Sequence, residues 1–245
     1  MKQSVYEVLS NEKIAKDVFK MILIGDTDAI TAPGQFINIK IDGYFLRRPI
    51  SVCDWDDKSI TIIYKVVGAG TLVMSRMVKG DTLDVLTGLG NGYNTFKSGE
   101  SPLLVGGGVG VPPLYGLCKR LVAEGKKPTV VLGFNSADDV FYEDEFKALG
   151  ADVYVATADG SYGEKGFVTS VISRLDYSFF YTCGPEPMFR AMAKVMKTEG
   201  QYSFEERMGC GFGACMGCSC KTLTGNKRIC REGPVMESGE IIWND

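Results

Sequence analysis

Histidine is absent from all 245 residues of this chain, and its absence removes several kinds of site at once. Without imidazole there can be no histidine acid–base catalysis, no His-ligated zinc and no Rieske-type iron–sulfur centre. The chain also lacks an excess of basic residues, since 27 Lys and Arg face 30 Asp and Glu. A nucleic-acid surface needs a basic patch, so no nucleic-acid partner is expected.

Hydrophobic runs long enough for a membrane helix are scarce. Residues 101–118 carry no charge, but five Gly and three Pro in that stretch suit a turn-rich loop beside a buried strand. The first residues, MKQSVYEVLS, alternate apolar and polar side chains and match neither a signal peptide nor an anchor. We therefore expect a soluble, cytoplasmic protein with no membrane partner.

The pattern of apolar and polar residues changes twice along the chain, which indicates three parts. Residues 1–98 contain short runs rich in Val, Ile and aromatics, at 18–24, 36–41, 60–67 and 82–86, typical of a small barrel or sandwich. Between 99 and 200, apolar runs of strand length alternate with helical patterns. This alternation predicts a parallel sheet covered on both faces, with ligands bound beyond the carboxyl ends of its strands. Residues 201–245 show neither the short β-like runs nor the strand–helix alternation, and they are expected to need a metal to fold.

Five of the eight cysteines are concentrated near the carboxyl terminus. Cys210, Cys215, Cys218 and Cys230 form C-x4-C-x2-C-x11-C, and its first three match the plant-type [2Fe–2S] spacing. The glycines between them leave room for thiolates to point inward and for N–H groups to approach sulfur. The spacing favours an iron–sulfur cluster; a zinc site and unligated thiols are the alternatives. Cys220 is a spare thiol, and Cys53, Cys118 and Cys183 are scattered.

Two turns of the middle part are candidates for a pyrophosphate site. Residues 103–105 run into GGGVGVPP, so a glycine turn separates an apolar strand from a helix begun by proline, and a helix N-terminus attracts phosphate. A second turn follows the last predicted strand of this part. An ordinary turn is the alternative for both. The candidate residues are Gly106, Gly107, Gly108 and Gly110 in the first turn and Cys183, Gly184 and Pro185 in the second.

The segment LRRPIS, residues 46–51, follows the second β-like run. Proline keeps its backbone extended, so an arginine and the serine can reach one site, and guanidinium suits a diphosphate. The alternative is a pair of solvated arginines.

These motifs occur in an order that resembles the ferredoxin–NADP reductase superfamily and, within it, the electron-transfer subunits of type B dihydroorotate dehydrogenase. The resemblance covers essentially the whole chain, and LRRPIS, Ile63-Tyr64-Lys65 with Gly70-Thr71, and EERMGCGFGACMGC are its specific parts. It implies a six-stranded antiparallel flavin-binding barrel (1–98), a parallel-sheet nicotinamide domain (99–200) and a small [2Fe–2S] module (201–245).

The resemblance also implies roles for residues. Arg48, Pro49, Ile50 and Ser51 would hold the FAD diphosphate and flavin edge, Ile63, Tyr64 and Lys65 would pack on and hydrogen-bond the cofactor, and Gly70 and Thr71 would bind its phosphate. Cys210, Cys215, Cys218 and Cys230 would ligate the cluster.

The implied activity is electron transfer for a partner enzyme. In this family an FMN-containing catalytic subunit oxidises dihydroorotate to orotate in pyrimidine biosynthesis. Electrons then pass through the cluster and FAD to NAD⁺, since flavin handles one or two electrons. A heterotetramer of two subunits of each kind is implied. NAD is favoured over NADP because residues 133–138 contain no Arg to meet a 2′-phosphate.

Two competing functions remain open at this point. One is the flavin subunit of an NAD(P)H-dependent ferredoxin or polysulfide reductase. The other is a zinc-stapled binding module without redox function.

Overall fold

The N-terminal strands close into a six-stranded antiparallel barrel with the order β1-β2-β5-β4-β3-β6, which confirms the predicted barrel. The computed structural model describes residues 1–243. Alternating residues of each strand fill the barrel, as Ile37 and Ile39 do on β3. The strands are β1 (Lys2–Ala15), β2 (Val18–Ile24), β3 (Phe36–Ile39), β4 (Arg48–Trp55), β5 (Ser59–Lys65) and β6 (Thr82–Leu89), and a short helix, α1 (Ala69–Met74), adds Met74 to the barrel core.

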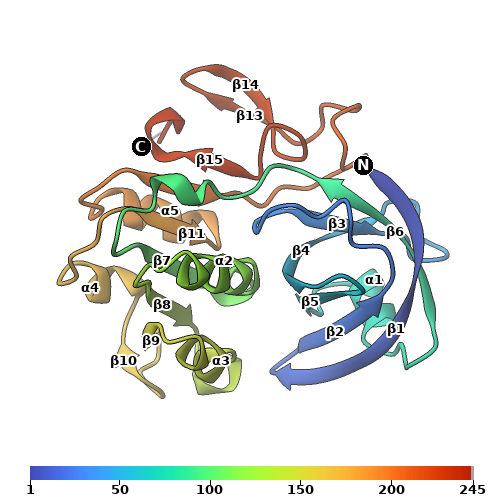
Figure 1. The fold of residues 1–245 in the computed structure, drawn as a ribbon, viewed down its shortest axis with the longest axis horizontal. Coiled ribbons are helices and arrows are strands. Elements are labelled where there is room, and N and C mark those ends of the chain that lie inside the picture. The colour runs from blue at the N-terminus through green and yellow to red at the C-terminus, as the bar shows by residue number, and fades with distance from the viewer. Residues whose placement is uncertain (244–245) are drawn as a thin grey trace.

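A seven-stranded sheet stands beside the barrel, and its order is β10-β9-β8-β7-β11-β12-β15 (Figure 1). Six of its strands run parallel, and β15 is antiparallel. The strands are β7 (Leu103–Gly107), β8 (Thr129–Phe134), β9 (Asp152–Thr157), β10 (Glu164–Lys165), β11 (Phe180–Cys183), β12 (Gly200–Ser203) and β15 (Val235–Glu237).

Helices cover both faces of this sheet, as the apolar strands predict. Leu104 and Leu132 face α2 (Pro112–Ala123) and α3 (Glu143–Ala148). The intervening residues, such as Val105 and Val131, face α4 (Val168–Ile172) and α5 (Glu186–Ala193).

The barrel and the sheet are packed tightly against each other. Val18, Cys53 and Ile63 of the barrel lie in the same apolar cluster as α2. A Cβ at Gly116 of α2 would lie 2.8 Å from the Cys53 carbonyl oxygen, so only glycine allows this approach.

The C-terminal module lies across the adjoining edges of barrel and sheet (Figure 1). It contains the hairpin β13 (Ser219–Thr222) and β14 (Gly225–Arg228), and its Cys218, Ile229 and Cys230 pack on Phe36 of the barrel. Asn91 ties it further, donating to the Glu232 and Val235 carbonyls at 3.0 and 2.7 Å. Because β12 runs from Gly200 to Ser203 and β15 lies within the expected third part, the sheet extends beyond residue 200. Residues 244–245 of the expected third part lie outside the described residues.

None of the helices in residues 1–243 combines the length and apolar character that crossing a bilayer requires.

Candidate functional site

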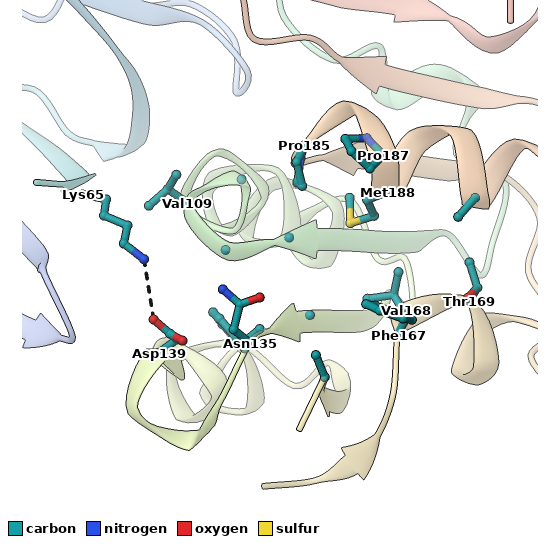
Figure 2. A pocket seen from close by; sticks show the side chains of 18 of the residues that line it. Lys65, Val109, Asn135, Asp139, Phe167, Val168, Thr169, Pro185, Pro187 and Met188 are labelled. Carbon is teal, nitrogen blue, oxygen red and sulfur yellow. Dashed lines mark ion pairs between the residues drawn. The ribbon is translucent and has the colours of Figure 1, made fainter. Parts of the chain in front are cut away.

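A cavity of about 570 Å³ opens at the carboxyl ends of the parallel strands. This volume is in the range of small-molecule sites, ~300–1,000 Å³. The loops after β7, β8, β9 and β11 form its walls, and β2 and β5 of the barrel add Val18 and Lys65. Figure 2 shows Lys65 and Asp139 at one end and Val168, Thr169 and Met188 at the other. The position agrees with where ligands bind in open α/β sheets.

Five of the seven residues predicted for the pyrophosphate site line this cavity: Gly107, Gly108, Gly110, Gly184 and Pro185. The other two, Gly106 and Cys183, pack against the lining residues on the side away from the cavity. Gly106 is buried within β7, where a Cβ would meet Val111 at 2.8 Å, and the Cys183 carbonyl oxygen would lie 2.2 Å from a Cβ on Gly110. The two predicted turns are therefore in direct contact and form one wall.

Lys65, which was predicted to contact the flavin cofactor, also lines this cavity, but Asp139 and several other lining residues were not predicted. Lys65 Nζ of the barrel lies 3.6 Å from Asp139 Oδ1 of the sheet domain, so an ion pair bridges the two bodies at the cavity (Figure 2). Asn135, Phe167, Thr169 and Glu205 also line it. Asn135 directly follows β8 at the carboxyl edge of the sheet, and this position could have identified it as a lining residue. No local pattern marks Asp139 as a partner of Lys65.

A second feature lies on the barrel, where β4 and β5 diverge. Their ladder joins Val52–Trp55 to Ile60–Ile62. Before it, residues 48–51 of β4 pair with β3, and after it, residues 63–65 of β5 pair with β2. Two predicted flavin segments thus lie on facing strand edges outside their shared ladder. Edges of this kind present backbone N–H and C=O groups that a planar, polar ring system can use.

Arg47 and Arg48 are directed to different places. Arg47 forms an ion pair with Asp84 at 2.8 Å and donates to the Asn38 and Asp84 carbonyls at 3.3 and 3.0 Å. Arg48 instead lies against the start of α1, because a Cβ on Gly70 would be 2.3 Å from Arg48 Nε. The first turn of a helix has N–H groups without helical partners, so a guanidinium beside it suits a diphosphate.

The remaining flavin candidates are distributed around this point. Pro49, Ile50 and Ser51 are half-buried on β4, and Ile63 is buried between barrel and sheet. Tyr64 turns into the barrel, where its hydroxyl donates to Asn11 Oδ1 at 2.9 Å, so only its backbone can face the divergent edges. The Thr71 hydroxyl accepts from the Val67 and Gly68 N–H groups and donates to the Gly68 carbonyl, so it fixes the turn that begins α1.

The four predicted ligand cysteines form two pairs. Cys210 and Cys215 each point a backbone N–H at the other's sulfur at 3.4 Å. The Cys230 N–H points at Cys218 Sγ, also at 3.4 Å. All eight cysteines in the chain are free thiols, and within residues 1–243 no three Cys, His, Asp or Glu side chains are arranged to hold one metal ion. Two pairs suit a centre of two irons better than a tetrahedral zinc.

The surroundings of the sulfurs also suit a cluster. Ala214 N lies 3.2 Å and Gly217 N 3.5 Å from a cysteine sulfur. Burial alone would raise the pKa of the Cys210 thiol. The pKa is nevertheless lowered to about 6 by hydrogen bonds from Phe212, Cys215 and Ala214. A thiol of that pKa is largely thiolate at neutral pH and ready to ligate iron. A Cβ on Gly209 would lie 3.1 Å from Cys215 Sγ, so glycine keeps this side open.

Asn38 connects the cluster loop to the strands that carry the flavin candidates. It pairs with Pro49 across β3 and β4, and its Nδ2 donates to the Cys210 carbonyl at 3.3 Å. Its side chain is 1% exposed, and in the described part of the chain its Oδ1 accepts no hydrogen bond. The thiol pairs and the divergent strands are therefore neighbours.

Comparison with known proteins gives the same assignment. The model of the iron-sulfur cluster binding domain of dihydroorotate dehydrogenase B matches residues 205–242, and an oxidoreductase NAD-binding domain model matches residues 104–194. A protein of Geobacillus sp. (strain WCH70) named dihydroorotate dehydrogenase B (NAD(+)), electron transfer subunit, is 44% identical over 256 residues, which are 99% of each chain. The chain belongs to the family of dihydroorotate dehydrogenase B electron transfer subunits.

Two solved structures share the fold of this family member. A chain of the NADH-dependent reduced ferredoxin-NADP oxidoreductase is 30% identical, with a TM-score of 0.88, over 98% of this chain and 90% of that one. A ferredoxin NADP⁺ reductase from Neisseria gonorrhoeae shares the fold at 14% identity, with a TM-score of 0.68, over 80% and 92% of the two chains.

The other four cysteines of this family member are free thiols. Burial raises the pKa of Cys53, of Cys118 and of Cys183 to about 12, so each remains a neutral thiol. Cys220 is half-buried on β13, with its sulfur 4.0 Å from Met236 Sδ, and packs as a small apolar residue.

We expect Gly110→Ala to weaken dinucleotide binding at least tenfold and to cost ~1–3 kcal/mol of stability, because a methyl group forced into packed backbone must displace it. The added Cβ would lie 2.2 Å from the Cys183 carbonyl oxygen, which is backbone and cannot rotate away. Calorimetric titration with NAD⁺ and thermal unfolding would measure both effects. Gly239→Ala is the matched control, since its Cβ would meet nothing within 4 Å. Unchanged NAD⁺ affinity in Gly110→Ala would show that the two turns are not the binding wall.

Proposed function

We propose that this chain carries electrons from the FMN-containing catalytic subunit of dihydroorotate dehydrogenase B to NAD⁺, through a [2Fe–2S] cluster and FAD. The observation that carries the proposal is the order of the three sites. The backbone carbonyl of Cys210 accepts from Asn38, and Asn38 pairs with Pro49 of the Arg48–Ser51 segment of β4. That segment faces residues 63–65 of β5, and Lys65 of β5 lines the cavity. The one-electron site therefore lies next to the flavin site, and the flavin site lies next to the dinucleotide site.

The residues present suit these groups. Cys210, Cys215, Cys218 and Cys230 would hold the cluster. Arg48 and the start of α1 would hold the FAD diphosphate, and the facing edges of β4 and β5 would hold the flavin ring. The glycine turns after β7 and β11 would hold the dinucleotide. Bound FAD supplies the exchange between single electrons and hydride, and the protein positions it and excludes water from it.

The division of labour follows the three parts of the chain. We assign flavin binding to residues 1–98, dinucleotide binding to residues 99–200 and the cluster to residues 201–245. We assign a heterotetramer of two electron transfer and two catalytic subunits, located in the cytoplasm. NAD⁺ rather than NADP⁺ is the acceptor, because the turn after β8 has acidic Asp138 and Asp139 and no Arg for a 2′-phosphate.

Iron and flavin analysis of anaerobically purified protein tests the proposal directly. We expect a brown protein with one FAD and about two irons per chain, as for a [2Fe–2S] centre. Addition of NADH should bleach the flavin absorbance. Colourless protein with one zinc would instead establish the zinc-stapled module.

A reconstitution experiment separates this function from that of a ferredoxin or polysulfide reductase. Mixed with an FMN-containing dihydroorotate dehydrogenase catalytic subunit, the chain should support NAD⁺ reduction by dihydroorotate. Activity with ferredoxin or polysulfide, and none with dihydroorotate and the catalytic subunit, would favour the reductase.

A further inference from the structure

One peptide group of the cluster loop is held at both of its polar ends. Its carbonyl, on Gly213, accepts a 2.6 Å hydrogen bond from Arg228 Nη1. Its N–H, on Ala214, points at Cys210 Sγ, with nitrogen and sulfur 3.2 Å apart. Because a peptide group is planar, with C=O and N–H directed oppositely, the contact that fixes the carbonyl also fixes the direction of the N–H.

The guanidinium that holds this carbonyl is itself held. Arg228 Nε donates to Glu232 Oε2 at 2.9 Å, and Nη2 forms an ion pair with Glu232 Oε1. The Arg228 backbone N–H donates to Glu232 Oε2 at 2.8 Å. Glu232 is tied to the barrel in turn, since its carbonyl accepts from Asn91 Nδ2 at 3.0 Å. The Arg228 side chain is only 25% exposed, so its planar guanidinium group has a defined position.

The glycine at the contact is also required. Gly213 has φ +94°, a left-handed conformation, and its Cβ would lie 2.7 Å from Arg231 Cδ. A residue with a side chain would be strained in this conformation and would have to displace the Arg231 side chain. The loop therefore contains a chain of contacts from Glu232 through Arg228 and the peptide to a ligand sulfur.

We propose that Arg228 is a positioning residue that raises the reduction potential of the cluster, by aiming the Ala214 N–H at the Cys210 sulfur. The inference rests on the proposed function, because it requires a cluster on these thiols. Reduction adds negative charge to the centre, so N–H donors to its sulfurs stabilise the reduced form more than the oxidised form. The guanidinium also polarises the peptide through the carbonyl, which strengthens the hydrogen bond at its other end.

Arg228→Gln in the holoprotein tests the proposal. A redox titration monitored by electron paramagnetic resonance should show the equilibrium for cluster reduction weakened on the order of tenfold, a fall of about 59 mV for one electron. The flavin potential should not change. Arg231→Gln is the matched control, because it removes the same charge from the same loop but not the donor to Gly213; its shift should be clearly smaller.

Two results would overturn the proposal: an unchanged cluster potential in Arg228→Gln, or equal shifts in the Arg228 and Arg231 variants, since the effect would then be charge alone. If Arg228→Gln binds no iron, Arg228→Lys decides, because it keeps the charge but has no planar fork for both Gly213 and Glu232. Its potential should lie below that of the unaltered protein, and an unchanged value would refute the inference. A wild-type protein without a cluster would refute the proposed function instead.

Discussion

Replacing Cys215 by serine is expected to abolish the iron–sulfur absorbance and the paramagnetic signal of the reduced protein. Cys215 forms a pair with Cys210, and their N–H groups point at each other's sulfur at 3.4 Å. A serine hydroxyl is a poor ligand for iron beside soft thiolates. Loss of one member of the pair leaves one iron with a single protein sulfur, which a four-thiolate centre cannot tolerate.

Cys220→Ser is the control for this prediction, because Cys220 lies in the same module but packs beside Met236. It should keep full iron content. Iron analysis, visible absorbance and paramagnetic resonance of both variants, purified anaerobically, provide the comparison. In Cys215→Ser the flavin should remain, since Arg48 and the β4 and β5 edges belong to the barrel. A Cys215→Ser protein with normal iron and signal would refute the ligand assignment.

Arg48→Ala is expected to weaken FAD binding by about 10- to 100-fold, which is the loss of charge-assisted hydrogen bonds worth ~1.5–3 kcal/mol. The Arg48 side chain lies across Gly70 at the start of α1 and stacks its guanidinium 5.1 Å from the centre of the Tyr44 ring. Removal of the cation leaves the N–H groups of a short helix alone to face a diphosphate. Ultrafiltration of diluted protein, followed by measurement of released flavin, gives the dissociation constant.

Arg47→Ala is the natural counterpart, since the two arginines are adjacent in sequence and differ in their partners. Arg47 is paired with Asp84 and donates to two barrel carbonyls. Its loss should lower the melting temperature through ~1 kcal/mol of lost interactions while FAD remains bound. If both variants released flavin equally, Arg48 would have no special role at the diphosphate.

Taken together, the variants separate the sites. Cys215→Ser removes the cluster, Arg48→Ala the flavin and Gly110→Ala the dinucleotide, and each should leave the other two groups measurable. We expect this independence because Cys215 lies in the C-terminal module, Arg48 on barrel strand β4 and Gly110 in the turn after β7.

Local sequence determined the features that depend on neighbouring residues. The C-x4-C-x2-C spacing brings Cys210 and Cys215 together because a glycine-rich loop of four residues can close on itself. The apolar runs beginning at residues 103 and 129 could only be buried strands. The glycine turn after β7 and the proline-started α2 also followed from conformational preference. Six-strand closure and the flavin role of LRRPIS came from family resemblance instead, because β1 and β4 were not among the strand-like runs that local composition indicated.

Tertiary structure alone decided the features that join distant residues. Asn38 contacts Cys210 across 172 residues, and no local pattern marks it. Whether Tyr64 faced the cofactor or the barrel depended on strand register, and the register turned its side chain inward. Lys65 meets Asp139 only because an apolar cluster shared by the barrel and α2 fixes the barrel against the sheet. Arg228 reaches Gly213 only because the module folds β14 back onto the cysteine loop. The amino-acid sequence determines which residues are present, and the burial of apolar surface determines which distant residues come into contact.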